Sequence, residues 1–152
     1  MSVEELYREV ILDHYRNPRN RGTIDHPDVF AEGNNPLCGD ELTVALRFDA
    51  NRVAEVAIQG QGCSISQSSA SMMSQAIEGK TLDEVRDLIA TFKAMMDIDT
   101  TPTETGLDPD RPGTVLGDLE ALQGVRKFPV RIKCANLAWT TLEEALRNRV
   151  DR

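Results

Sequence analysis

Residues 42–58 read LTVALRFDANRVAEVAI, and this stretch predicts an antiparallel β-hairpin. In each half, apolar residues alternate with more polar ones, which is the pattern of a strand with one buried face. The alternating apolar positions are Leu42, Val44, Leu46 and Phe48 in the first half, and Ala54, Val56 and Ile58 in the second. Asp49 to Arg52 carries the turn-forming residues between them.

Helical periodicity surrounds this hairpin on both sides. The expected helices cover about residues 2–17, 64–79, 81–92 and 115–123, and a last helix begins near Pro129. Capping boxes are expected at Ser2–Glu5, Ser64–Gln67 and Thr81–Glu84. With a short edge strand near residues 29–31, the fold class is α+β: an N-terminal helix and about three antiparallel strands, covered by C-terminal helices. At 152 residues the chain is expected to form one domain, 1–152.

The composition narrows the range of functions. Asp and Glu number 25 against 17 Lys and Arg, and this net charge of −8 disfavours a nucleic-acid surface. No segment approaches the ~20 apolar residues of a membrane span, and the first residues lack the apolar block of an export signal. The three cysteines are an odd number, which argues against a closed disulfide framework. We therefore expect a cytoplasmic protein with reduced thiols.

Two of the cysteines are predicted to meet in space. Cys38 precedes the first hairpin strand, in a turn-forming setting between Pro36 and Gly39. Cys63 follows the second strand, at the start of a predicted helix, where the helix dipole lowers the pKa of a thiol. Because an antiparallel hairpin returns to the end where it began, the two thiols should lie at the same end of the sheet.

Cys134 and Asp40 complete a candidate set of four ligands. Three thiolates and one carboxylate are the number and type of donors that a tetrahedral zinc ion binds. Each residue also has a simpler explanation: buried packing for a cysteine, which leaves Cys134 open, and local turn chemistry for Asp40. No Cys-x-x-Cys pair occurs, so the spacing alone is a weak indication of zinc.

Four motifs resemble the U-type iron–sulfur cluster assembly family, which includes IscU and the N-terminal domain of NifU. They are DHYRNPRN at 13–20, NNPLCGD at 34–40, GQGCSIS at 60–66 and FPVRIKC at 128–134. The resemblance covers nearly the whole chain and implies an α+β scaffold of the SufE/NifU-like kind. It also implies that Cys38, Asp40, Cys63 and Cys134 form a metal site. The implied partner is a cysteine desulfurase of the SufS type, and the free protein is expected to be a monomer or weak oligomer.

Within this family the chain is most similar to the SufU branch. Lys133 stands where the scaffold branch has a histidine, and the stretch between the second and third cysteines is long. The resemblance implies a zinc-dependent sulfurtransferase that accepts persulfide sulfur on Cys38. Arg131, one helical turn before Cys134, is the second candidate catalytic residue, because it could stabilise a persulfide anion; a surface salt bridge is the alternative.

Two other functions remain open from the sequence. The first is a scaffold that assembles a [2Fe-2S] cluster on the same ligands. The second is an interaction module whose zinc only supports the fold.

Overall fold

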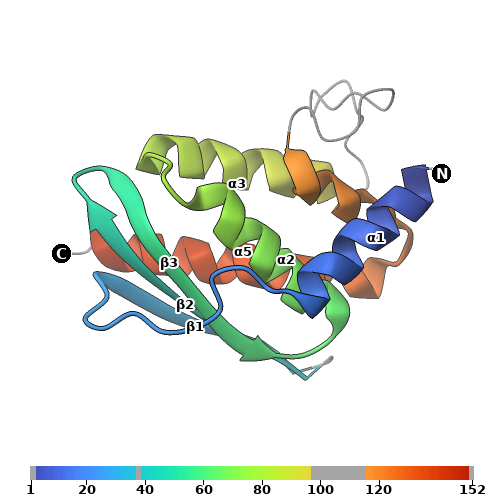
Figure 1. Cartoon of the computed structure of the whole chain (residues 1–152), viewed down its shortest axis with the longest axis horizontal. Helices are drawn as coiled ribbons and strands as arrows, with labels where there is room; N and C mark the ends of the chain where they lie inside the picture. The colour runs from blue at the N-terminus through green and yellow to red at the C-terminus, as the bar shows by residue number, and fades with distance from the viewer. Residues whose placement is uncertain (1–2, 37–38, 97–115, 151–152) are drawn as a thin grey trace.

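The computed structural model describes residues 3–36, 39–96 and 116–150. In chain order the elements are α1 (Val3–Arg16), β1 (Val29–Asn35), β2 (Asp40–Asp49), β3 (Arg52–Gln61), α2 (Ser64–Ile77), α3 (Leu82–Met96), the 3₁₀ helix η1 (Gly117–Lys127) and α5 (Pro129–Val150) (Figure 1). The predicted α+β class and order of elements are confirmed.

The three strands form one antiparallel sheet in the order β1-β2-β3. Val44 lies opposite Ile58 and Leu46 opposite Val56, and all four side chains are buried, as their alternation predicts. The prediction for Ala54 is wrong, because the register shifts between Arg47 and Phe48. This irregularity leaves Ala54 without an opposite residue, so it is exposed, and Val53 turns into the core in its place.

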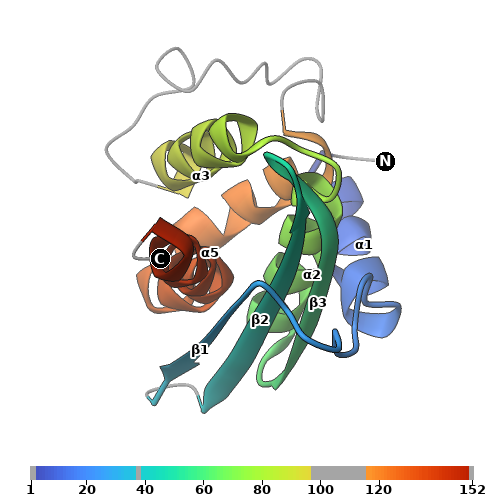
Figure 2. The same cartoon turned by 90° about the vertical axis from the view of Figure 1, so that its left-hand side faces the viewer.

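Helices cover one face of the sheet. α5 runs along β1 and β2, and α2 packs on β3, with α2 lying between α5 and α1 (Figure 2). The core between these layers is apolar, and Trp139 on α5 stacks on Phe92 on α3 with ring centroids 4.3 Å apart. Thus α2 and α5 are both fixed against the sheet near its end at Asp40.

Of three predicted helix ends, one is confirmed and two are wrong. The Thr81–Glu84 capping box is confirmed, since each backbone N–H donates to the other residue's side chain. The Ser64–Gln67 box is wrong, because the residue that caps α2 is Cys63. The helix expected over 115–123 is η1, which continues past Gly124 to Lys127, since Gly124 does not adopt the positive φ that would end it. Ser2 and residues 97–115 lie outside the described residues.

The approach of α5 to β1 depends on Gly33. A Cβ built on Gly33 would collide with the Thr141 hydroxyl and lie 3.2 Å from Leu137 Cδ1, both on α5. The missing side chain lets the helix lie directly on the strand.

We predict that Gly33→Ala lowers the free energy of unfolding by about 1–3 kcal/mol, because the new methyl group overpacks the α5–β1 contact. Urea denaturation measures the change. Gly124→Ala is the control, since open space surrounds that position, and it should leave the midpoint nearly unchanged or raise it slightly. Equal effects of the two substitutions would contradict the close packing.

Candidate metal centre

Asp40 is a buried carboxylate at the first position of β2. Its Oδ1 atom accepts a hydrogen bond from the backbone N–H of Cys63, with a donor–acceptor distance of 2.9 Å. This bond joins the beginning of β2 to the beginning of α2. The second oxygen, Oδ2, lies 4.0 Å from Cys63 Sγ and is directed toward the thiols.

Cys63 is the N-cap of α2. Its backbone is extended, with φ −71° and ψ 166°, because it directly continues the chain out of β3. In this position Sγ accepts the backbone N–H of Ser66 at 3.4 Å. The cap thus presents Sγ at the N-terminus of α2, beside the first backbone N–H groups of the helix.

Gly62 makes room for this arrangement. Its φ of 152° lies in the range that favours glycine, and a Cβ there would collide with Asp40 Oδ1 and lie 2.8 Å from Ser66 Oγ. The sequence places Gly62 directly before a cysteine at a strand-to-helix junction. Its close approach to Asp40 and the hydrogen bond from the Ser66 N–H come only from the structure.

Cys134 lies in the second turn of α5 and is fully buried. One ligand atom from each of Asp40, Cys63 and Cys134 lies within 4.8 Å of the other two. The fold thus brings together three of the four residues of the predicted metal site. The fourth, Cys38, lies outside the described residues.

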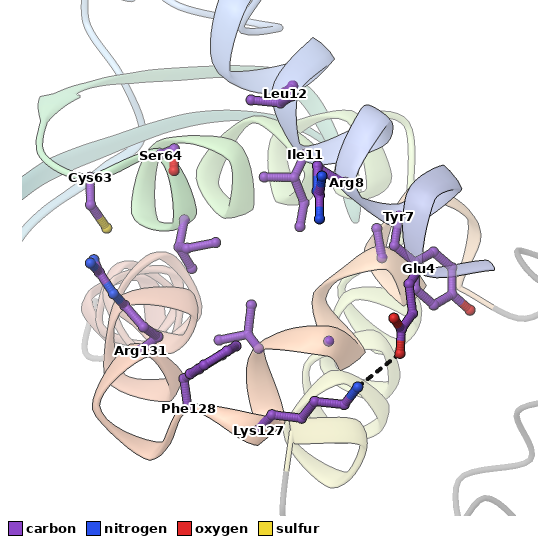
Figure 3. A pocket seen from close by; sticks show the side chains of 14 residues that line it. Glu4, Tyr7, Arg8, Ile11, Leu12, Cys63, Ser64, Lys127, Phe128 and Arg131 are labelled. Atoms are coloured by element: carbon purple, nitrogen blue, oxygen red, sulfur yellow. Dashed lines mark hydrogen bonds and ion pairs between the residues drawn. The ribbon is translucent and has the colours of Figure 1, made fainter. Parts of the chain in front are cut away.

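Arg131 lies one helical turn before Cys134 and is exposed. The charge of the Cys63 thiolate, together with a hydrogen bond to Cys134, raises the pKa of Arg131 above its ordinary value. In Figure 3 the guanidinium reaches toward the Cys63 sulfur. The arrangement can therefore hold negative charge on sulfur next to a fixed cation.

A groove leads away from Cys63 and Arg131. It has a volume of about 780 Å³ and lies between α1, the start of α2, and the segment from η1 to α5. Figure 3 shows Ile11 and Phe128 at its wall, and the ion pair between Glu4 and Lys127 at the end far from Cys63. Three cationic side chains but one carboxylate line it, in a chain with net charge −8.

A second polar cluster resembles a hydrolase triad but is closed to substrate. His14 Nδ1 lies 2.8 Å from Ser71 Oγ, and His14 Nε2 lies 2.9 Å from Asp118 Oδ2. The Asp118 carboxylate accepts a hydrogen bond from the Nε2–H of His14, and Ser71 Oγ also accepts the backbone N–H of Arg19. His14 and Ser71 are fully buried, so this cluster joins α1, α2 and η1 rather than presenting a nucleophile.

Among the described residues, no helix combines the length and apolar character needed to cross a membrane.

Comparison with known proteins finds one matching family and several similar proteins. A family model described as the NifU-like N terminal domain matches residues 6–135. The chain is 43% identical over 145 residues to the zinc-dependent sulfurtransferase SufU of Bacillus subtilis (strain 168), covering 95% of this chain and 92% of that protein. It is 37% identical over 145 residues to the iron–sulfur cluster assembly scaffold protein IscU of Streptococcus pyogenes serotype M1, covering 95% and 85%.

A solved structure supports the fold. The N-terminal part of a nitrogen-fixing NifU-like protein from Brucella abortus matches with a TM-score of 0.82 and 23% identity, covering 99% of each chain. At this identity the match concerns the fold alone.

We predict that Gly62→Ala lowers the free energy of unfolding by about 1–3 kcal/mol more than Gly22→Ala does, because only the former displaces a charged hydrogen-bond acceptor. Gly22 is a matched control, since its φ of 153° is nearly the same and nothing lies within 4 Å of its Cβ position. The difference between the two urea midpoints isolates the Asp40–Cys63 contact from backbone strain. Identical midpoints would refute the role assigned to Gly62.

Proposed function

The chain belongs to the NifU-like N-terminal domain family of U-type iron–sulfur cluster assembly proteins, and from this premise we propose that it accepts sulfur on Cys38 from a cysteine desulfurase. The resemblance inferred from the four motifs, including the similarity to SufU, is confirmed. In this proposal the whole chain, 1–152, acts as one domain.

The observation that carries the proposal is the convergence of Asp40, Cys63 and Cys134, whose ligand atoms lie within 4.8 Å of one another. Cys38 is two residues from Asp40, so its Cα lies within about 7 Å of the Asp40 Cα along the chain. This is near enough for Cys38 to join the other three as the fourth ligand.

The donor set fits zinc. Three thiols and one carboxylate match the ligands of a four-coordinate zinc site. The ligand atoms of the three described residues lie within 4.8 Å of one another, against the ~3.8 Å between neighbouring ligands that a Zn–S bond of ~2.3 Å gives in a tetrahedron. When bound, zinc would keep the thiols deprotonated near neutral pH without changing oxidation state, so it would not oxidise a persulfide.

The proposed transfer is an attack by the Cys38 thiolate on the terminal sulfur of a cysteine persulfide on the desulfurase. The donor's S–S bond breaks, the donor cysteine leaves as a thiolate, and a new S–S bond forms on Cys38, with no net oxidation or reduction. Asp40, Cys63 and Cys134 hold the site together during the step. Arg131 stabilises the anionic terminal sulfur on Cys38 through its fixed positive charge.

The groove beside Cys63 and Arg131 is the proposed docking surface for the desulfurase. It is continuous with the site, and Phe128 in its wall exposes 61% of its surface. Its excess of cationic side chains favours a donor segment that carries apolar and acidic residues.

Assembly of a [2Fe-2S] cluster on the same ligands is the second candidate function, because the chain is 37% identical to a protein named as an IscU scaffold. Lys133 favours sulfur transfer, since it stands where the scaffold branch has a histidine. X-ray absorption of protein purified without added iron separates the two: one zinc with sulfur neighbours supports transfer, and a two-iron cluster supports the scaffold.

We predict that Cys38→Ser abolishes sulfur acceptance but retains much of the zinc, since Asp40, Cys63, Cys134 and a water can complete the coordination. Desulfurase turnover and mass spectrometry of the acceptor thiols measure the first effect, and metal analysis the second. Cys134→Ser is the comparison variant and should lose both zinc and stability. A persulfide on Cys63 or Cys134 in wild-type protein, with Cys38 unmodified, would contradict the assignment.

We predict that Arg8→Glu raises the KM for the desulfurase about tenfold with kcat unchanged, because it reverses a charge at the docking groove without touching the thiols. Arg147→Glu is the control. Arg147 is an exposed arginine on α5 that lies 16 residues beyond Arg131, a distance of about 24 Å along the helix. If the two variants raise KM equally, net charge rather than the groove governs docking.

A further inference from the structure

The hydroxyl of Ser69 connects α2 to α5 next to the metal centre. Ser69 is fully buried, and its Oγ donates to the backbone carbonyl oxygen of Ala135 at 2.7 Å. The same oxygen accepts the indole N–H of Trp139 at 3.3 Å. Ala135 directly follows Cys134 in the chain.

The direction of both hydrogen bonds is determined by the groups involved. An indole N–H can only donate and a carbonyl oxygen can only accept, so the single proton of Ser69 must point to Ala135. The face of the indole ring also stacks on Phe92, with an interplanar angle of 16°. The hydroxyl therefore sits between two partners that packing has already placed.

This connection lies between the two helices that carry the thiols. Cys63 is six residues before Ser69, about 9 Å along α2, and Cys134 is one residue before the carbonyl that Ser69 holds. The buried α5 residues beside this carbonyl include the small Ala135 and Ala138 and the bulky Trp139, whose indole also reaches Ser69. The Ser69 hydroxyl therefore connects α2 to two successive turns of α5, at Ala135 and at Trp139.

We propose that Ser69 is a positioning residue that sets the spacing between the Cys63 and Cys134 thiolates. The inference rests on the proposed function, because it concerns how the chain preorganises its own metal ligands. Groups that orient the ligands of a metal commonly change its affinity by 10–100-fold when they are removed. Ser69 differs from such groups in acting on the backbone beside a ligand rather than on the ligand itself.

Ser68 is a natural matched control. It is the neighbouring residue on α2 and is also fully buried, but its hydroxyl donates within its own helix, to the Ser64 carbonyl oxygen at 2.6 Å. Removing the Ser68 hydroxyl deletes a buried hydrogen bond of the same kind on the same helix, but this bond does not involve α5.

The test compares Ser69→Ala with Ser68→Ala in the full chain. Zinc dissociation constants come from competition with a chelator, and the electronic spectrum of the Co²⁺-loaded protein reports on the geometry around the metal. Ser69→Ala should raise the zinc Kd about 10-fold and shift the Co²⁺ bands, because the thiolates lose their fixed separation. Ser68→Ala should change neither quantity, even if it lowers thermal stability by a similar amount.

The outcomes separate this inference from the proposed function. Wild-type protein that binds neither Zn²⁺ nor Co²⁺ through sulfur would refute the metal site itself, and the role of Ser69 with it. Wild-type binding with the same Kd and spectrum in both serine variants would refute only the role of Ser69. If Ser69→Ala does not fold, Trp139→Phe retains the ring stack but removes the donor that orients Ser69. It should also raise the Kd, and a wild-type value would overturn the inference.

Discussion

The hydrogen bond from the Cys63 backbone N–H to the Asp40 carboxylate is the contact on which the candidate metal centre depends. It connects the first residue of β2 to the first turn of α2, so the end of the sheet and a helix N-terminus become one unit. The strand delivers Cys63 in an extended conformation, and the helix begins directly after it. Gly62 is required between them, because any side chain would occupy the space of the carboxylate.

α5 contributes the third described residue of the site, Cys134. The helix covers β1 and β2 and also carries Arg131 and Cys134, so the packing that stabilises the fold also determines the position of two site residues. Gly33 controls how closely α5 lies on the sheet, and Ser69 connects it to α2. A substitution in the core between these helices therefore acts on the thiols as well as on stability.

Electrostatics distinguish this region from the rest of an acidic chain. A helix N-terminus, the Ser66 backbone N–H and the Arg131 guanidinium all lie beside the Cys63 sulfur. The neighbouring groove continues the positive region toward Arg8 and Lys127. In the proposed function, this positive region would face an acidic surface of the sulfur donor.

The sequence by itself determined the α+β class, the hairpin and the start of α5, because these follow from local periodicity. The return of the hairpin also predicted that Cys38 and Cys63 lie at one end of the sheet; Cys38 lies outside the described residues, and its neighbour Asp40 contacts Cys63 there. The sequence did not determine the placement of Cys134, the exposure of Ala54 or the capping role of Cys63. Local patterns cannot predict a register shift between two strands, and they cannot predict which face of a distant helix packs on the sheet. Only the tertiary structure decided that Cys134 meets the other two ligands, because α5 is positioned by contacts with residues that lie far away in the chain, such as Gly33 and Ser69.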